Sequence, residues 1–582
     1  MKALDRIEHS VDICVVGGGL AGLCAALAAA RHGARVLLMH ERPVLGGNAS
    51  SEIRVHICGA DRAGSIPFLR ETGILEEVRL ENLRRNPNHS YSIWDTVLYE
   101  KAMLQPRLTT LLNCSCADAA TDGERISSVT GWQQTTQTWH TVAADVFVDC
   151  SGDAILAPLT GALYRVGREG RGEYGESIAP EQPDHRTMGM TCLFQARKYD
   201  SPQPFAPLPW AYTFERDEEI PYGERAHRWL EMGYWWVELG GEYDSIRDTE
   251  KLRHELLRIV FGLWDHIKNR GDHGAENWAL EWIQFLPGKR ESRRYIGDHV
   301  LTQLDIESEG KFADLVAYGG WSMDDHHPAG FWAVKSGAPA TIFHPAPSPY
   351  GIPYRALYSR NVANLMFAGR CASCTHAAMS STRVMGTAAS MGQAVGVAAA
   401  IAARRGVAPR GVGEHIEELQ QTLLHDDCYL PGVVQGFGEL TKTAKLVASQ
   451  GDPEPLRDGV NRPIGENPHC WPCRAGDSVT YQLARPRPVD SVTLILDSAL
   501  DKAIRMSRHD SRERLAALPP SMPKEFRIEG REGGEWQPLV SVEDNGQRLV
   551  RFPIQRTLDA IRFALDRTWG GDSSRVYAFY LD

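Results

Sequence analysis

The chain has 582 residues, of which 43% are hydrophobic and 24% are charged, and its net charge is −11. The length predicts about two to four domains, and the composition is that of an ordinary globular protein. The excess of acidic residues argues against nucleic acid or an anionic membrane as the main partner.

Targeting signals and metal motifs are weak in this sequence. No apolar run reaches about 18 residues without a charge, so we expect no transmembrane helix. The first residues, MKALDRIEHS, are charged and lack the apolar segment of a signal peptide. Among twelve scattered cysteines, Cys371/Cys374 and Cys470/Cys473 have CxxC spacing. Zinc needs four ligands, so we interpret these as structural thiols, expect no metal site, and expect a reduced, cytoplasmic protein.

Residues 11–41 have the pattern of a strand, a glycine-rich turn, a helix and a second strand. VDICVV is followed by GGGLAG, LCAALAAARHG and ARVLLMHE. Gly17, Gly19 and Gly22 form G-x-G-x-x-G, which allows a tight turn, a close approach to a pyrophosphate, and close packing of helix on strand. Glu41 ends the second strand, where a carboxylate accepts hydrogen bonds from ribose hydroxyls. The unit predicts dinucleotide binding, and Glu41 disfavours NADP without separating NAD from FAD.

Three further stretches resemble motifs of large FAD-dependent oxidoreductases of the glutathione-reductase-like superfamily. ERPVLGGNASSEIR resembles the loop that passes the pyrophosphate toward the flavin, and residues 144–162 resemble a strand that ends in Asp-x-(Ser/Thr)-Gly-Asp. Residues 364–402 resemble the final FAD motif, a strand ending in Ala-Gly-Arg before a long helix. That helix is rich in Gly and Ala, which suits close packing against the first β-α-β unit or the isoalloxazine. The resemblance implies that FAD is bound by Gly17, Gly19, Gly22, Glu41, Arg42, Gly46, Gly47, Asn48, Ser50, Gly152, Asp153, Gly369, Arg370 and Gly386.

The amino-acid sequences of several segments resemble those of a bacterial group of FAD-dependent oxidoreductases that is sometimes called xanthan-lyase-like. The segments that carry this resemblance are GGNASSEIR, LPGKRESRRYIGDHVLTQLD, GGWSMDDHHPAGFW and GRCASCTHAAMSSTRVMG, within about residues 10–405. It implies an α/β fold, with a Rossmann-like FAD-binding domain and an inserted α+β substrate domain. We expect the FAD-binding domain at 1–165 and 355–405, the substrate or cap domain at 166–354, a helical segment and linker at 406–465, and a β-sandwich at 466–582.

Aromatic side chains are concentrated in the middle of the chain, between the FAD motifs. RWLEMGYWWVELGGEYDS mixes rings with acids, which is the pattern of a carbohydrate platform. The other interpretation is core packing in a sheet that covers the flavin. The residues in question are Trp210, Tyr212, Phe214, Tyr222, Trp229, Tyr234, Trp235, Trp236 and Tyr243.

The segment WSMDDHHPAGFW places Asp324, Asp325, His326 and His327 before a proline. Such a group suggests catalysis or substrate binding, with a structural role as the alternative. Successive side chains of an extended loop alternate in direction, so the four are poorly placed to hold one metal ion. A histidine with a carboxylate partner that acts as proton acceptor fits better.

Basic residues and a further histidine complete the candidates. LPGKRESRRYIGDHV carries Lys289, Arg290, Arg293 and Arg294, which suit an anionic substrate group or the flavin, although alternation along a strand would keep them from facing one site. In the superfamily that the chain resembles, the position of His376 comes close to the flavin ring. His376 and Arg383 are therefore candidates for substrate or flavin contacts, and helix capping by Thr375 and Ser380 is the alternative. Weaker candidates are His56 and Cys58.

The C-terminal part changes to short alternating strands after a boundary rich in Gly, Pro and Asn. SVTYQLARP, VDSVTLILDS and LDAIRFAL are examples of these strands. They predict an all-β sandwich that resembles discoidin-like, galactose-binding-like domains. Glycan binding and plain packing against a catalytic domain both remain open for it.

These features together predict an FAD-dependent oxidoreductase. The hypothesis is hydride transfer from a hydroxyl-bearing carbon of a sugar-like or other small polar substrate. His326, His327 or His376 takes the hydroxyl proton, and Arg290, Arg293 or Arg383 binds an oxyanion. The alternatives are a fumarate-reductase-type enzyme, in which an arginine donates a proton to an unsaturated acid, and a glycan-binding scaffold with structural FAD. Oxygen, a quinone or a protein remains open as electron acceptor, as does a homo-oligomer.

Overall fold

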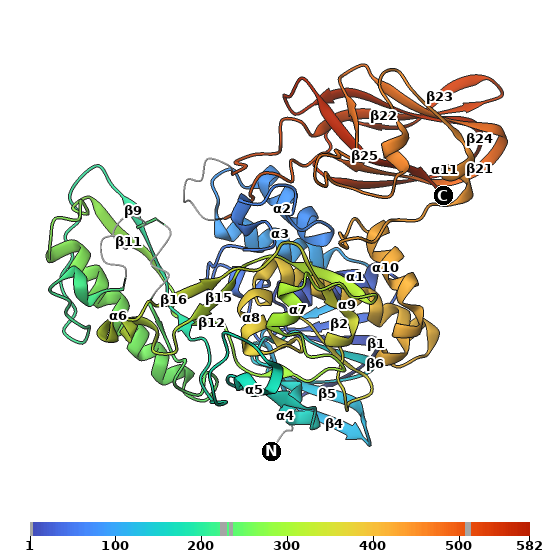
Figure 1. The fold of residues 1–582 in the computed structure, drawn as a ribbon. Coiled ribbons are helices and arrows are strands. Elements are labelled where there is room, and N and C mark those ends of the chain that lie inside the picture. The colour runs from blue at the N-terminus through green and yellow to red at the C-terminus, as the bar shows by residue number, and fades with distance from the viewer. Residues whose placement is uncertain (1–3, 222–229, 232–236, 507–513) are drawn as a thin grey trace. The chain divides into compact units, whose positions relative to one another are not determined.

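A computed structural model describes residues 4–221, 230–231, 237–506 and 514–582. The chain divides into two compact units, each built from segments that lie far apart in the sequence (Figure 1). The first unit comprises Met1–Gly59, His89–His415 and Met506–Ser511. The second comprises Ala60–Asn88, Ile416–Arg505 and Arg512–Asp582.

A seven-stranded sheet forms the centre of the first unit. Its order is β3-β2-β1-β6-β5-β4, and β18 also pairs with β6. Strands β1, β2, β3, β6 and β18 run parallel, whereas β5 and β4 extend the sheet in antiparallel fashion. The parallel strands end at one edge, which is where open α/β sheets bind ligands. The strands are β1 (Arg6–Val16), β2 (Val36–Met39), β3 (Leu108–Leu111), β4 (Cys114–Asp122), β5 (Arg125–Gln133), β6 (Thr138–Asp149) and β18 (Leu365–Phe367).

Two helices of this unit, α1 (Leu20–Arg31) and α9 (Met385–Arg405), pack closely on one another. A Cβ at Gly392 of α9 would lie 2.1 Å from the carbonyl oxygen of Ala21, and Gly396 repeats this approach one turn later. The glycines of α9 therefore serve its packing on the first β-α-β unit, which is one of the two roles that the sequence suggested. Among the described helices, α9 alone is long and apolar enough to cross a membrane, but 89% of its most apolar window is buried.

Short sheets and one long helix, α6 (Thr249–Asn269), occupy the segment between β6 and β18 (Figure 1). The sheets pair β10-β8-β12, β11-β9, β13-β7, β14-β17 and β15-β16. Their strands are β7 (Tyr164–Arg165), β8 (Met190–Thr191), β9 (Phe194–Lys198), β10 (Glu238–Leu239), β11 (Trp278–Ile283), β12 (Gly288–Lys289), β13 (Arg294–Tyr295), β14 (Leu315–Gly319), β15 (Met323–His326), β16 (Thr341–His344) and β17 (Tyr350–Pro353).

Several aromatic residues of this segment belong to its core. Phe214 is 4% exposed and joins the hydrophobic cluster around α6, where its ring centre lies 5.4 Å from that of Phe331. Tyr212 packs against the same cluster, with the guanidinium of Arg258 4.2 Å from its ring centre. Trp210 and Tyr243 are exposed. The other rings suggested as a sugar platform lie outside the described residues: Tyr222, Trp229, Tyr234, Trp235 and Trp236.

The second unit contains a seven-stranded antiparallel sheet with the order β20-β25-β21-β24-β22-β23, and β19 pairs with β21. Short strands were predicted here, but β21 and β24 are long. Their pairing shifts register between Gln482 and Arg487, and such irregularities let one strand bend and continue. The strands are β19 (Lys445–Ala448), β20 (Trp471–Cys473), β21 (Ser478–Leu496), β22 (Pro523–Glu532), β23 (Glu535–Val542), β24 (Leu549–Thr568) and β25 (Ser574–Leu581).

The segment Ala60–Asn88, with helix α2 (Ile74–Arg85), also belongs to the second unit. Arg70 is fully buried, pairs with Glu76 at 2.5 Å, and donates to the carbonyl oxygen of Ser498 at 2.9 Å. Breaking such a buried pair typically costs about 3–5 kcal/mol. A stretch that lies in sequence within the expected first part of the FAD-binding domain thus contributes to the core around the C-terminal sheet.

Candidate functional site

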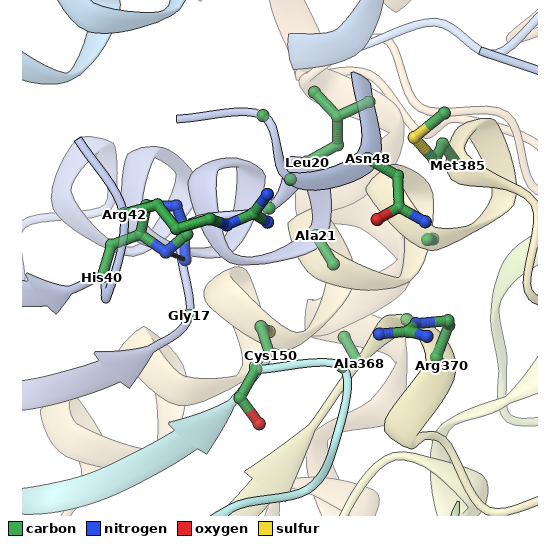
Figure 2. Close-up of a pocket in the computed structure, with 18 of the residues that line it drawn as sticks. Gly17, Leu20, Ala21, His40, Arg42, Asn48, Cys150, Ala368, Arg370 and Met385 are labelled. Carbon is green, nitrogen blue, oxygen red and sulfur yellow. Dashed lines mark hydrogen bonds between the residues drawn. The ribbon is translucent and has the colours of Figure 1, made fainter. Parts of the chain in front are cut away.

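A pocket lies in the first unit, where β1, β2, β6 and β18 end (Figure 2). The first turns of α1 and α9 complete its wall. The lining residues are Gly17, Gly18, Gly19, Leu20, Ala21, His40, Glu41, Arg42, Gly46, Gly47, Asn48, Cys150, Ser151, Gly152, Ala368, Gly369, Arg370, Arg383, Met385 and Ala388.

Most of the residues expected to bind the cofactor line this pocket. Those that do not are Gly22, Ser50, Asp153 and Gly386. Gly22 serves packing, because a Cβ there would lie 1.8 Å from the carbonyl oxygen of Gly17. Asp153 accepts a hydrogen bond from Lys289 Nζ at 2.6 Å. Gly22 therefore has the packing role that the motif assigns to its third glycine, and Asp153 supports the wall through its partners.

Much of the pocket wall is backbone. Gly17 has a φ of 100°, and a Cβ there would lie 2.5 Å from the carbonyl carbon of Cys150. Gly47 has a φ of 60°, and its Cβ would lie 3.0 Å from Cα of Gly19. Gly19 precedes α1 without a side-chain cap, so the N–H groups of the first helical turn remain to bind a ligand. A helix N-terminus of this kind suits a phosphate.

Arg370 adds a half-buried cation to this wall. Its Nη2 lies 3.7 Å from Oδ1 of Asp153, and its Nη1 has no hydrogen-bond partner within the described ranges. A buried donor without a partner costs about 1–3 kcal/mol, and an oxygen of a bound cofactor would remove that cost. The glycine cradle and this donor together fit a dinucleotide such as FAD.

His40 is a pocket residue that the sequence reasoning missed. Its Nδ1 accepts the N–H of Gly18 at 2.9 Å, and its Nε2 lies 3.0 Å from the carbonyl oxygen of Val44, to which it donates. The ring thereby ties the glycine turn to the loop after β2. The position of His40 beside Glu41 was visible in the sequence, but nothing in the local pattern predicted that the ring would turn inward.

The pocket has two distinct ends. His40 and Arg42 lie at one end, and Asn48, Arg370 and Met385 lie at the other (Figure 2). In this fold the end of the second strand receives the adenosine ribose. The end with Met385 therefore faces the second half of a bound dinucleotide.

Next to that end lies a group of ionisable side chains, here called the charged cluster. Its members are Glu238, Arg290, Glu291, Asp324, Asp325, His326, His376 and Arg383. Arg383 belongs to both sites: it lines the pocket, and its Nη2 donates to the carbonyl oxygen of Asp324 at 3.1 Å and to its Oδ2 at 3.2 Å. Arg383 Nε has no hydrogen-bond partner within the described ranges.

His376 lies between two carboxylates. Its Nδ1 is 2.8 Å from Oε2 of Glu291, and its Nε2 is 3.1 Å from Oδ1 of Asp325. Burial alone would lower the pKa of His376, but these carboxylates raise it to about 10. The ring is therefore an imidazolium at neutral pH and donates from both nitrogens.

His326 has the same kind of environment. Its Nδ1 is 2.6 Å from Oε2 of Glu238, and its Nε2 is 3.3 Å from Oδ2 of Asp324. Burial and the charge of Arg290 oppose protonation, yet Glu238 and Asp324 raise the pKa of His326. These carboxylates favour the protonated form of each ring, which disfavours the predicted role of His326 or His376 as proton acceptor.

The other two predicted catalytic residues are His327 and Arg290, of which Arg290 belongs to the charged cluster. His327 Nδ1 accepts the N–H of Ala329 at 3.1 Å. Arg290 is buried, donates to Oγ1 of Thr191 at 2.5 Å, and lies 3.3 Å from Oε2 of Glu238. Burial lowers the pKa of Arg290, and Glu238 offsets this effect only in part.

The remaining basic residues of the same segment do not join one site. Lys289 and Arg293 both contact Asp153, through its carboxylate and its carbonyl oxygen respectively. Arg294 is fully buried and donates to Glu169 at 2.8 Å.

The two buried glutamates of the charged cluster were missed. Glu238 and Glu291 lie 88 and 85 positions from the histidines that they bind, so no local spacing connects each pair. The signals that the sequence offered were the acids of RWLEMGYWWVELGGEYDS, which include Glu238, and the acid of KRES, which is Glu291.

Cys58, a weaker candidate from the sequence, has a structural contact through its backbone. The carbonyl oxygen of Cys58 accepts the N–H of Gly386 at 2.8 Å, which holds the loop of Cys58 to the start of α9. Within the described part of the chain, none of the twelve cysteines forms a disulfide.

Comparison with known proteins places the chain in a family. The profile of the family "FAD dependent oxidoreductase" matches residues 12–423. Sarcosine oxidase subunit alpha from Corynebacterium sp. (strain U-96) is 43% identical over 67 residues, which are 12% of this chain and 7% of that subunit. The chain thus matches only a small part of that relative.

Two solved structures show weaker likeness. A geranylgeranyl bacteriochlorophyll reductase-like protein from Thermoplasma acidophilum aligns with a TM-score of 0.33 and 11% identity, over 72% of this chain and 86% of that one. The family 32 carbohydrate-binding module from Streptococcus pneumoniae EndoD aligns with a TM-score of 0.20 and 15% identity, over 25% of this chain and 97% of the module. By the family match, which covers most of its length, the chain belongs to the FAD-dependent oxidoreductases, and its cofactor is FAD.

Proposed function

We propose that this enzyme oxidises a hydroxyl-bearing carbon of a small polar substrate held beside the charged cluster. The observation that carries the proposal is the double position of Arg383, which lines the cofactor pocket and binds Asp324. FAD in that pocket would accept a hydride, and the chain's own residues would bind the substrate and receive its proton.

Asp325 is the proton acceptor in this proposal. Its Oδ1 is held by His376, and 23% of its side chain is exposed, more than for any other member of the charged cluster. Burial alone would raise the pKa of Asp325, but His376 lowers it, so the group is a carboxylate at neutral pH. A carboxylate with a low pKa is a weak base. Transfer of the hydroxyl proton therefore accompanies cleavage of the C–H bond rather than preceding it.

The imidazolium of His376 positions this carboxylate. Glu291 is completely buried and holds Nδ1 of the ring, which directs Nε2 at Asp325. His376 thus acts through Asp325 and takes no proton itself.

The same groups support a substrate that carries several hydroxyls. Asp324 and Asp325 offer acceptor oxygens, and Arg383 offers the donor Nε. A sugar-like or hydroxy-acid substrate has the donors and acceptors to meet this set. A fully apolar substrate would leave Arg383 Nε without a partner, at a cost of about 1–3 kcal/mol.

A second candidate function rests on Arg290. Burial lowers the pKa of this guanidinium, and its contact with Glu238 gives a route for a proton to return. Such an arginine suits donation of a proton to the activated double bond of an unsaturated acid. The enzyme would then work as a reductase.

An anaerobic screen separates the two functions. The oxidised holoenzyme is mixed without oxygen with sugars, glycosides and hydroxy acids, and loss of the oxidised flavin absorbance is followed. In parallel, the chemically reduced enzyme is mixed with unsaturated acids, and return of that absorbance is followed. Bleaching by a hydroxyl compound supports oxidation; reoxidation by an unsaturated acid, without bleaching by any hydroxyl compound, overturns it in favour of reduction.

A further inference from the structure

We propose that Asp217, His266 and His273 bind a divalent transition-metal ion in the first unit. One ligand atom from each residue lies within 4.8 Å of the others. None of the three lines the cofactor pocket, and the proposal does not depend on the function proposed above. The three come from the 3₁₀ turn Asp217–Glu219, the end of α6 and the loop that follows α6.

His266 is oriented as a metal ligand would be. Its Nδ1 lies 2.8 Å from the carbonyl oxygen of Phe214, to which it donates. The neutral ring then has its lone pair on Nε2, and this atom lies 2.8 Å from Oδ1 of Asp217. Two lone pairs at that distance repel unless a cation, either a proton or a metal ion, lies between the groups. Metal-binding histidines commonly donate their other N–H to a backbone carbonyl in this way.

His273 brings the second imidazole to the same point. Its ring centre lies 4.9 Å from that of His266. A Cβ at Gly271 would lie 2.6 Å from Nε2 of His273, so a larger residue would crowd that nitrogen. Asp217 is 35% exposed, which leaves room for water to complete the coordination.

The surrounding charges also favour a cation. Arg270, one of the bases near this point in the described part of the chain, is engaged by Glu215 at 2.6 Å and by Asp265 at 3.3 Å. Asp272 precedes His273 and adds a further acid. The repulsion that Arg270 would exert on a metal ion is therefore largely compensated.

The ligand set indicates the class of metal. Two imidazole nitrogens and one carboxylate oxygen suit zinc and related transition metals, whereas magnesium and calcium prefer oxygen ligands alone. Bound there, the ion would join the 3₁₀ turn of Asp217 to the end of α6. It would stabilise this part of the first unit.

Zinc binding by the purified holoenzyme tests the site. The protein is treated with chelator, dialysed against zinc chloride and freed of unbound metal, and zinc is measured by mass spectrometry together with flavin absorbance. We expect about one equivalent of zinc per chain and a higher melting temperature in zinc than in chelator. His273→Gln should bind zinc at least about tenfold more weakly, while keeping its FAD.

The control is His254→Gln, which changes an exposed histidine on the same helix. It should bind zinc as the wild type does. Asp217→Asn, at a partly exposed position, is the second variant if His273→Gln loses its flavin. The proposal is overturned if the wild type retains no zinc, or if both ligand variants retain as much as His254→Gln. In that case the His266 and Asp217 pair is an ordinary ion pair that shares a proton.

Discussion

The cofactor pocket and the charged cluster adjoin each other but are built in different ways. The pocket is shaped by backbone, as at Gly17, where a side chain would collide with Cys150. The charged cluster is shaped by side chains, as at His376, whose two nitrogens are both used by carboxylates. Backbone geometry therefore shapes the cofactor pocket, whereas side-chain charges that compensate one another shape the charged cluster.

The comparison predicts that a single methyl group disables the pocket. Gly17→Ala adds a Cβ at a left-handed position and 2.5 Å from the Cys150 backbone. We expect a loss of about 3–5 kcal/mol in stability and at least a tenfold fall in bound FAD. The ratio of flavin absorbance to protein absorbance measures this loss.

Gly33→Ala is the matched control for that change. Gly33 also has a positive φ, 94°, but a Cβ there meets nothing within 4 Å. This variant should lose only about 1–2 kcal/mol and keep its FAD. Equal FAD loss in both variants would show that backbone strain, and not the shape of the pocket, is responsible.

The charged cluster should instead respond to pH. The pKa of His376 is raised from 6.5 to about 10, so its contribution to stability is complete below pH 6.5 and is lost as the pH rises toward 10. That contribution is on the order of 5 kcal/mol. Melting temperatures measured from pH 6 to pH 10 should fall for the wild type and change less for His376→Gln.

His185→Gln, at an exposed position, is the reference for this pH profile and should follow the wild type. If His376→Gln also followed the wild type, the imidazolium between Glu291 and Asp325 would not exist in solution.

Arg383 tests whether the pocket and the charged cluster are linked, because it lines the pocket and also binds Asp324. Arg383→Lys keeps the charge but loses the planar set of donors. We expect FAD affinity to fall by about 1–2 kcal/mol, roughly tenfold, as measured by titrating stripped protein with FAD. Arg186→Lys, at an exposed position, should bind FAD like the wild type. Unchanged affinity in Arg383→Lys would mean that Arg383 serves the charged cluster alone.

The pocket was largely predictable from sequence because several of its residues lie close together in the chain, in a motif with known spacing. Gly17, Gly19 and Glu41 lie within one strand-turn-helix-strand unit, so their roles follow from short-range geometry. His40 escaped prediction because the inward turn of its ring depends on Gly18 and Val44.

The charged cluster was predictable only in part. His326, His376 and Arg383 were identified, but their protonation depends on Glu238 and Glu291, which are remote in sequence. The second unit gives the same lesson. Arg70 donates to the carbonyl oxygen of Ser498, which lies 428 positions away in the sequence, and no sequence pattern near Arg70 predicts that contact.

In the proposed function, Asp325 receives a proton while the substrate carbon is oxidised. The most direct measurement is the anaerobic rate of flavin reduction in Asp325→Asn, with the hydroxyl compound that bleaches the wild-type flavin. Asp200→Asn, at an exposed position, is the control. We predict a rate about 10²–10⁴-fold below that of the wild type, at equal FAD content. A rate within about twofold of the wild type would contradict the claim, because general base catalysis is normally worth far more.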